Sequence, residues 1–202
     1  PSITTQPLTQ TVCEGTANVT FTVIATGTGL TYQWKKNGVD IPLATASSYV
    51  IATAATGDAG TYTVQVSGTC TPPVTSAGAV LTINELPEIT VQPVSQTVCE
   101  GQSVTLTVNA GVTSNPTYQW RKGGVNIPGA TSSSYTIATT TTADAGNYDV
   151  VVSSSNAGCN TPVTSSTVSI TINTAPVIGT QPLTQTVCEG TANVTFSVVA
   201  TG

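Results

Sequence analysis

The sequence has no histidine and very few charges. Lys and Arg together number 4 and Asp and Glu number 9, which gives a formal net charge of −5. Without histidine, neither a Ser–His–Asp nor a Cys–His catalytic arrangement is possible. Four scattered basic side chains cannot follow a phosphate backbone, so nucleic acid is not an expected partner. No apolar run reaches membrane-spanning length, so we expect no membrane insertion within these residues.

Methionine is also absent, and the sequence begins at Pro1. We therefore expect it to be a segment of a longer protein, with any export signal outside it. Threonine, in contrast, makes up roughly a fifth of the residues, and Val, Ser and Gly are abundant. This composition favours pleated strands and tight turns over helices. Low charge combined with many hydroxyl groups is typical of an extracellular surface.

A five-residue motif, Thr-Val-Cys-Glu-Gly, occurs three times, at residues 11–15, 97–101 and 186–190. The steps between its cysteines are 99 − 13 = 86 and 188 − 99 = 89 residues, each the length of a small domain. We therefore predict a first domain at 1–86, a second at 87–175 and the first strands of a third at 176–202. Residues 178–202 match residues 3–27 with three differences, which indicates duplication of repeat pairs.

Short stretches of alternating apolar and polar residues, separated by turns, predict an all-β fold. In the first repeat, Val19 to Val23 and Leu30 to Trp34 form two inward-facing rows. Asn37-Gly38 then gives a strong signal for a two-residue hairpin, and Gly123-Gly124 stands at the matching place in the second repeat.

Each repeat also carries a Trp on its third strand, an Asp-x-Gly-x-Tyr motif and a last Val-rich strand. The Trp, Asp and Tyr positions are Trp34, Asp58 and Tyr62 in the first repeat and Trp120, Asp144 and Tyr148 in the second. This pattern resembles the immunoglobulin domain, and its intermediate set in particular. The resemblance implies immunoglobulin-like β-sandwiches in a linear array, with both Trp side chains in the cores. It also implies tyrosine corners, in which each Tyr hydroxyl bonds to backbone across a turn.

One departure from the family pattern concerns its disulfide. The family joins its second and sixth strands by a disulfide between the two sheets. Here those positions hold Val23 with Val64, and Val108 with Val150. We therefore expect the cores to be held by apolar packing, with the cysteines placed elsewhere.

The five cysteines are Cys13, Cys70, Cys99, Cys159 and Cys188. Their positions follow the repeats, which favours an oxidising compartment. Two pairings are open. The first places one bridge in each repeat, Cys13–Cys70 and Cys99–Cys159, and a count of two cysteines per full repeat favours it.

The immunoglobulin topology argues for the second pairing. It places the Glu14-Gly15 turn and the Cys70 loop at opposite poles, several strand residues apart at about 3.3 Å each, whereas bridged Cα atoms lie within about 7 Å. The bottom of one domain faces the top of the next in a head-to-tail array. We therefore favour an inter-domain Cys13–Cys159 bridge. In that case Cys99 and Cys188 would meet downstream domains, and Cys70 an upstream one.

The acidic residues do not suggest a catalytic or metal site. Glu14 and its repeats belong to a turn motif, and Asp58 and Asp144 to the corner motif, so a catalytic carboxylate pair is not expected. A calcium site at the junctions would need Glu14, Glu85 and Glu88, and is disfavoured because no Asp-x-Asp run accompanies them. We predict no enzymatic activity, no cofactor and no metal.

Residues 32–38 (Tyr-Gln-Trp-Lys-Lys-Asn-Gly) and 67–76 (Ser-Gly-Thr-Cys-Thr-Pro-Pro-Val-Thr-Ser) are similar to the immunoglobulin-like repeats of giant secreted surface proteins of Bacteroidota. These include adhesins and gliding-motility filaments exported by the type IX system. The resemblance implies a disulfide-stiffened shaft of a bacterial cell-surface fibre. Its partners would be neighbouring repeats of the same chain and other copies of the filament, with the surface or glycan ligand unidentified.

Three other functions remain open. The first is a module that binds glycan or protein through its loops, indicated by a three-residue insertion before Cys159. The second is a non-catalytic spacer of a secreted enzyme. A eukaryotic immunoglobulin receptor is the third, and the missing core disulfide disfavours it.

Overall fold

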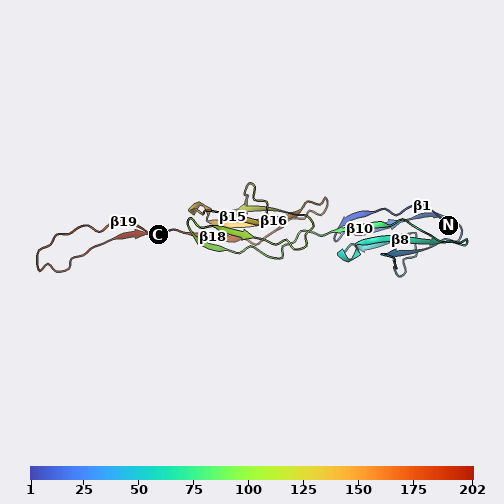
Figure 1. The fold of residues 1–202 in the computed structure, drawn as a ribbon, viewed down its shortest axis with the longest axis horizontal. Coiled ribbons are helices and arrows are strands. Elements are labelled where there is room, and N and C mark those ends of the chain that lie inside the picture. The colour runs from blue at the N-terminus through green and yellow to red at the C-terminus, as the bar shows by residue number, and fades with distance from the viewer. The chain divides into compact units, whose positions relative to one another are not determined.

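The computed structural model describes residues 1–202, and its regular structure consists of β-strands and two single-turn 3-10 helices (Figure 1). The all-β prediction is therefore confirmed. Neither helix has the length or the apolarity that a membrane span requires. The chain forms two compact units, of which the first contains residues 1–89, 110–117 and 152–163, and the second contains 90–109, 118–151 and 164–202. The domain boundaries at 86 and 175 stay a prediction.

The larger sheet of the first repeat has the order β2, β10, β8, β5, β6, and β9 pairs with β8. The strands are β2 (Gln10–Cys13), β5 (Thr31–Lys36), β6 (Val39–Asp40), β8 (Gly60–Ser67), β9 (Val74–Thr75) and β10 (Ala79–Asn84). Strands β2 and β10 are parallel, with Cys13 opposite Asn84, whereas β8 is antiparallel to both β10 and β5. Cys13 therefore ends its strand beside the residue from which the chain leaves the first repeat.

Two further sheets of the first repeat each consist of one antiparallel pair. Strand β1 (Ser2–Thr5) pairs with β4 (Ile24–Thr26), and β3 (Ala17–Thr22) pairs with β7 (Ser48–Thr53). Pro7, which is buried, lies between β1 and β2. Because proline has no N–H to donate to a ladder, it interrupts the first strand there, and the chain changes sheets.

The core of the first repeat is held by apolar packing, as the alternating pattern predicts. Val19, Phe21 and Val23 are each at most 4% exposed, and Trp34 is fully buried. The rings of Phe21 and Tyr62 stack with centroids 4.6 Å apart. The indole Nε1 of Trp34 donates to the carbonyl oxygen of Ala46 at 3.0 Å, so its burial leaves no polar atom unpaired.

Both tyrosine corners are formed. The Tyr62 hydroxyl donates to the carbonyl oxygen of Asp58 at 2.7 Å, and the Tyr148 hydroxyl donates to that of Asp144 at 2.7 Å. Each Asp closes a 3-10 turn, η1 (Thr56–Asp58) or η2 (Thr142–Asp144). Desolvation by burial raises the pKa of Tyr62 and of Tyr148 to about 12, so both hydroxyls stay protonated donors.

The second repeat uses the same strand order. Its larger sheet runs β11, β18, β16, β13, β14, with β17 paired to β16, and its smaller sheet pairs β12 with β15. The strands are β11 (Gln96–Cys99), β12 (Val104–Thr107), β13 (Pro116–Lys122), β14 (Val125–Asn126), β15 (Ser134–Ile137), β16 (Gly146–Ser154), β17 (Val163–Thr164) and β18 (Val168–Asn173). In place of β1, an isolated antiparallel bridge joins Val91 to Asn109.

The beginning of the third repeat forms one antiparallel pair, β19 (Val177–Thr180) with β20 (Val199–Thr201). Its apolar side chains are exposed, with Leu183 79% and Phe196 63% accessible. Phe196 is the counterpart of Phe21, which the complete first repeat buries to 1%. The apolar side chains of this strand are therefore buried only when the opposing sheet of the repeat is present.

Candidate functional site: a disulfide-linked junction

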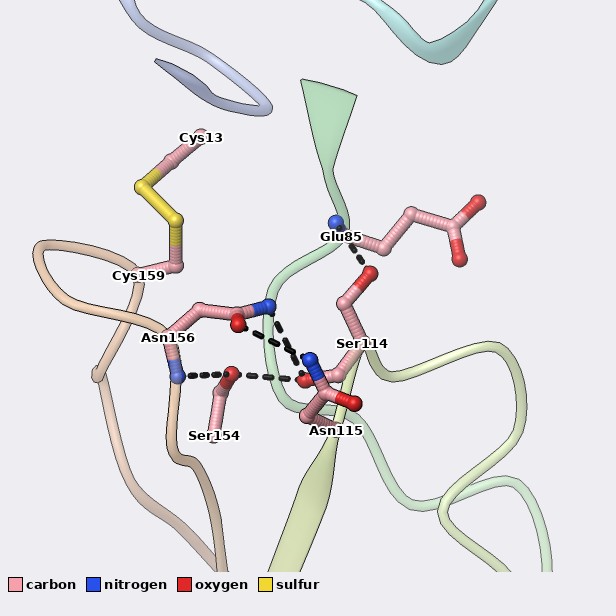
Figure 2. Close-up of a disulfide and its surroundings, with 7 residues drawn as sticks. All are labelled: Cys13, Glu85, Ser114, Asn115, Ser154, Asn156 and Cys159. Atoms are coloured by element: carbon pink, nitrogen blue, oxygen red, sulfur yellow. Dashed lines mark hydrogen bonds between the residues drawn. A yellow bond between two sulfur atoms is a disulfide. The ribbon is translucent and has the colours of Figure 1, made fainter. Parts of the chain in front are cut away.

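The structure contains a disulfide between Cys13 of the first repeat and Cys159 of the second (Figure 2). The two Cα atoms are 5.3 Å apart across 146 residues of sequence, and both cysteines belong to the first compact unit. This is the inter-domain pairing favoured above. Cys70, Cys99 and Cys188 have free, exposed thiols, so neither bridge of the within-repeat alternative is formed.

Cys13 is held by the turn that follows it. Its own carbonyl oxygen accepts from the Thr16 N–H at 3.1 Å, and the Glu14 N–H donates to the carbonyl oxygen of Asn84 at 2.9 Å. The Gly15 N–H donates to the carbonyl oxygen of Ala54 at 2.8 Å. Gly15 has φ +81°, a left-handed conformation that glycine adopts without a steric penalty. The repeated Cys-Glu-Gly motif is therefore a turn that fixes the cysteine at the end of its strand.

Cys159 lies in the loop between β16 and β17 and is 1% exposed. Its N–H donates to the carbonyl oxygen of Asn156 at 3.2 Å, which closes a turn around Gly158. Gly158 has φ +82°, and a Cβ there would lie 3.9 Å from the Cys13 Sγ. The loop therefore presents its cysteine at the tip of a turn that glycine permits.

The Cys159 loop is braced against the loop at residues 110–117. The Asn115 side-chain amide donates to Asn156 Oδ1 at 2.9 Å, and Ser154 Oγ donates to the carbonyl oxygen of Ser114 at 2.6 Å (Figure 2). The Asn156 N–H donates to Ser154 Oγ at 3.1 Å, and the Ser155 N–H donates to the carbonyl oxygen of Asn115 at 3.1 Å. The two loops form one hydrogen-bonded support for the disulfide.

The linker after β10 is pinned to the same loop. The Glu85 N–H donates to Ser114 Oγ at 3.0 Å (Figure 2), and the Ser114 N–H donates back to the Glu85 carbonyl oxygen at 3.4 Å. The Glu88 N–H donates to Thr113 Oγ1 at 3.0 Å, while its Oε1 accepts from the Val112 N–H at 2.9 Å. Two N–H groups, one carbonyl oxygen and one carboxylate of the linker are thus hydrogen-bonded to the loop of the second repeat.

The acidic residues of the junction do not assemble a metal site. Glu88 uses its carboxylate to accept a backbone N–H, as described above. No group of three or more His, Cys, Asp or Glu side chains in residues 1–202 is placed to hold a metal ion. The role of Glu88 in the structure is to anchor the linker.

Sequence reasoning identified both bridged cysteines but missed the hydroxyl and amide groups around them, namely Thr113, Ser114, Asn115, Ser154 and Asn156. Two signals were available. The loop before Cys159 carries the three-residue insertion, and the loop at 110–117 also departs from its counterpart in the first repeat. Local divergence between otherwise similar repeats marks the residues that meet a partner.

The family model described as "Immunoglobulin domain" matches the chain twice, at residues 1–68 and 87–154. Immunoglobulin domains are typically non-catalytic.

Several solved structures share the fold. An I-band fragment of titin gives a TM-score of 0.66 at 19% identity, covering 89% of this chain and 68% of the other. The first two immunoglobulin domains of DIP-gamma give a TM-score of 0.63 at 17% identity, covering 85% of this chain and 98% of the other. Immunoglobulin domains 1–4 of Sidekick-1 give 0.59 at 22% identity, covering 98% and 56%. At these identities the likeness shows the fold alone.

A curated relative is the "Decoration protein" of Escherichia phage T5, which is 40% identical over 80 residues. The matched region is 39% of this chain and 47% of that protein, so the alignment spans about half the length of the relative.

Proposed function

Because the chain belongs to the immunoglobulin domain family, we propose that it is a structural segment of a bacterial cell-surface fibre, of the adhesin or gliding-filament type. The observation that carries the proposal is the Cys13–Cys159 disulfide, which links two consecutive repeats covalently. A structural disulfide fits an extracellular protein, because thiols are kept reduced inside most cells. Export by the type IX system of Bacteroidota rests on the sequence resemblance described above.

The mechanical effect of the disulfide follows from the positions in the sequence of the two cysteines that it joins. A force applied to both ends passes from residues 1–13 through the two sulfur atoms to residue 159 and beyond. The intervening residues 14–158, which include Trp34 and Trp120, are bypassed and cannot be extended. The bridge also stabilises the folded state by about 5 kcal/mol in the chain-entropy description, because it closes a loop of 146 residues.

The hydrogen-bonded linker supports the same function. Short linkers between domains permit hinge motion unless they are held. Here Glu85 and Glu88 are bonded by the loop at 110–117, beside the disulfide. In the proposed fibre, the partners of each domain are the neighbouring repeats of the same chain. Other copies of the fibre and a surface ligand at its tip are further proposed partners.

Pulling single molecules by their ends tests the proposal. The oxidised chain is expected to extend only through its unbridged ends, and a reductant should then release roughly 500 Å more, since 146 residues contribute about 3.4 Å each. Cys13→Ser should give the long extension without reductant, while Cys70→Ser serves as the matched control because Cys70 forms no bond. An oxidised wild-type chain that extends as far as Cys13→Ser would contradict the proposal.

A second candidate is a display module that carries no tension, for which the similarity to the phage decoration protein is the supporting observation. In that role the chain would transmit no force between other parts of a fibre, for example because it is an appendage on a particle surface. The loop-binding alternative has less support, since the longer loop before Cys159 is occupied by the disulfide. The spacer alternative would be decided by a catalytic domain elsewhere in the same polypeptide.

A further inference from the structure

The second repeat builds the same cysteine turn as the first, but its thiol is free. The Glu100 N–H donates to the carbonyl oxygen of Asn173 at 2.9 Å, and the Gly101 N–H donates to that of Thr140 at 2.7 Å. The Gln102 N–H donates to the carbonyl oxygen of Cys99 at 3.1 Å, and Gly101 has φ +84°. Each contact matches one around Cys13 to within about 0.1 Å, so Cys99 is held in the geometry that bonds Cys159 at the other turn.

A hollow adjoins this free thiol. Cys99, Thr140, Thr174, Ala175 and Pro176 contribute to its walls, and its volume is about 620 Å³. Residues 174–176 occupy the sequence position of the pinned linker residues 85–87. The place that holds a cysteine loop at the first junction is thus present at the second, next to an exposed sulfur.

The segment that follows the second repeat is of the first type, meaning that it matches the first repeat: residues 178–202 match residues 3–27 with three differences. A completed repeat of this type would carry its loop cysteine at the counterpart of Cys70 and not of Cys159. Cys70 itself is exposed and unbonded in the first repeat. We propose that Cys99 forms a disulfide with the Cys70 counterpart of the next first-type repeat, so that two kinds of covalent junction alternate along the fibre. The inference rests on the proposed function, because it requires a fibre in which the third repeat is completed after residue 202.

The two junctions are closed by different contacts, which supports alternation. At the first, Glu88 accepts from the Val112 N–H, whereas Val177 stands at the matching position of the second linker and has no carboxylate. In a repeat of the first type, a glycine packs closely against the proline at the start of the repeat instead. A Cβ on Gly27 would lie 3.2 Å from the Pro1 Cα, and one on Gly202 would lie 2.8 Å from the Pro176 Cα. Hydrogen bonds therefore close one linker, and close glycine packing closes the other.

The bond is formed by thiol–disulfide exchange. A disulfide oxidant such as oxidised glutathione accepts the two electrons lost by the two thiols, and is itself reduced to two thiols with the two protons. The Cys99 thiolate attacks the mixed disulfide formed on the partner cysteine, and the glutathione thiolate leaves.

The test uses a chain with a completed third repeat. Residues 1–202 are followed by residues 28–86 of the same sequence, and the original Cys70 is changed by Cys70→Ser so that only the added copy remains. After oxidation with glutathione and alkylation, cleavage at glutamate isolates Cys99 in residues 89–100 and Cys13 in residues 1–14. Mass spectrometry should find residues 89–100 linked to the fragment with the added cysteine, and only Cys188 alkylated.

Fluorescence of the added Trp34 copy shows whether the third repeat has folded. With it folded and Cys13–Cys159 intact, alkylation of Cys99, or a bond between Cys99 and Cys188, overturns the proposal. The Cys99→Ser version of the extended chain should leave the added cysteine open to alkylation.

A second measurement uses only complete repeats. Cys70→Ser and Cys99→Ser versions of the 202-residue chain are mixed and oxidised, and the expected product is a mixed dimer bridged between Cys99 of one copy and Cys70 of the other. Absence of this dimer, or dimers formed equally within each version alone, overturns the proposal. A chain that forms the bridge but extends fully when pulled would refute the mechanical function and leave this pairing in place.

Discussion

The cores of the two repeats are alike, while their ends differ. Trp34 and Trp120 are both fully buried, and each indole donates to a backbone carbonyl twelve residues further on, at 3.0 and 2.9 Å. The two loop cysteines, in contrast, have opposite environments, since Cys70 is exposed and Cys159 is 1% exposed. A core is specified by the alternation within its own repeat. The environment of a loop is decided by the partner that meets it.

The largest effect is expected where this difference is greatest. Cys13→Ser should lower the free energy of unfolding by about 5 kcal/mol, because it opens the loop of 146 residues. Cys70→Ser, which removes an equally placed but unbonded thiol, should leave stability within about 0.5 kcal/mol of wild type. Chemical denaturation of the monomeric variants, with the free thiols alkylated so that Cys99 and Cys70 of different copies cannot pair, measures the contrast. Equal stabilities would mean that the disulfide does not stabilise the folded state.

The similarity of the cores leads to the next prediction. Trp34→Ala and Trp120→Ala should each cost about 3–5 kcal/mol, because each leaves a cavity at a fully buried position. The two losses should agree to within about 1 kcal/mol if the cores are as alike as their burial indicates. Denaturant titration followed by circular dichroism, which reports the unfolding of both repeats, measures the two losses. A much smaller loss in one repeat would show that its core is held differently.

One core position does differ between the repeats. Phe21 stacks on Tyr62 with centroids 4.6 Å apart. Leu106 takes the place of Phe21 in the second repeat, since it pairs with Tyr135 across the sheet as Phe21 pairs with Tyr49. Phe21→Leu should therefore cost about 1 kcal/mol, mainly through the lost aromatic pair. A thermal scan of Phe21→Leu beside Leu106→Phe completes the comparison. The second change should not stabilise, because a larger ring enters a core packed around leucine.

The sequence predicted those parts of the fold that depend on local rules. Alternation placed Phe21 in the core, and Asn37-Gly38 forms the expected two-residue turn, with φ of 49° and 83° and Lys36 paired to Val39. The corner motif likewise fixes Tyr62 on the Asp58 carbonyl. Each of these depends on spacing and on the conformational range of single residues.

The junction was less predictable because its groups are common in this chain. Thr113 and Ser114 bond the linker through hydroxyls, but roughly a fifth of the residues are Thr, so the residue type carries little information. Which hydroxyl meets which N–H is decided by the placement of the two loops, not by local pattern. For the cysteines two pairings stayed open, and the inter-domain one was favoured because the topology places Cys13 and Cys70 at opposite poles.

The smallest expected effect separates the two tyrosine corners. Asp144 Oδ2 accepts from both the N–H and the hydroxyl of Thr141 at 2.8 Å, whereas Asp58 Oδ2 accepts only from the Ala55 N–H, at 2.9 Å. The backbone and hydroxyl hydrogen bonds from Thr141, assisted by Lys122, hold the pKa of Asp144 below its ordinary value of 3.8. A lowered folded-state pKa gives stability that is present above the unfolded value and is lost as pH falls through the folded one.

Thr141→Ala should therefore raise the Asp144 pKa toward 3.8 and start the acid-induced loss at a higher pH. The stability change at neutral pH should be at most about 0.5 kcal/mol, because solvent screens this carboxylate. Carboxyl-carbon NMR titration of the variant beside wild type measures the shift. If the Asp144 carboxyl does not respond, the Thr141 hydroxyl does not hold its pKa down in solution.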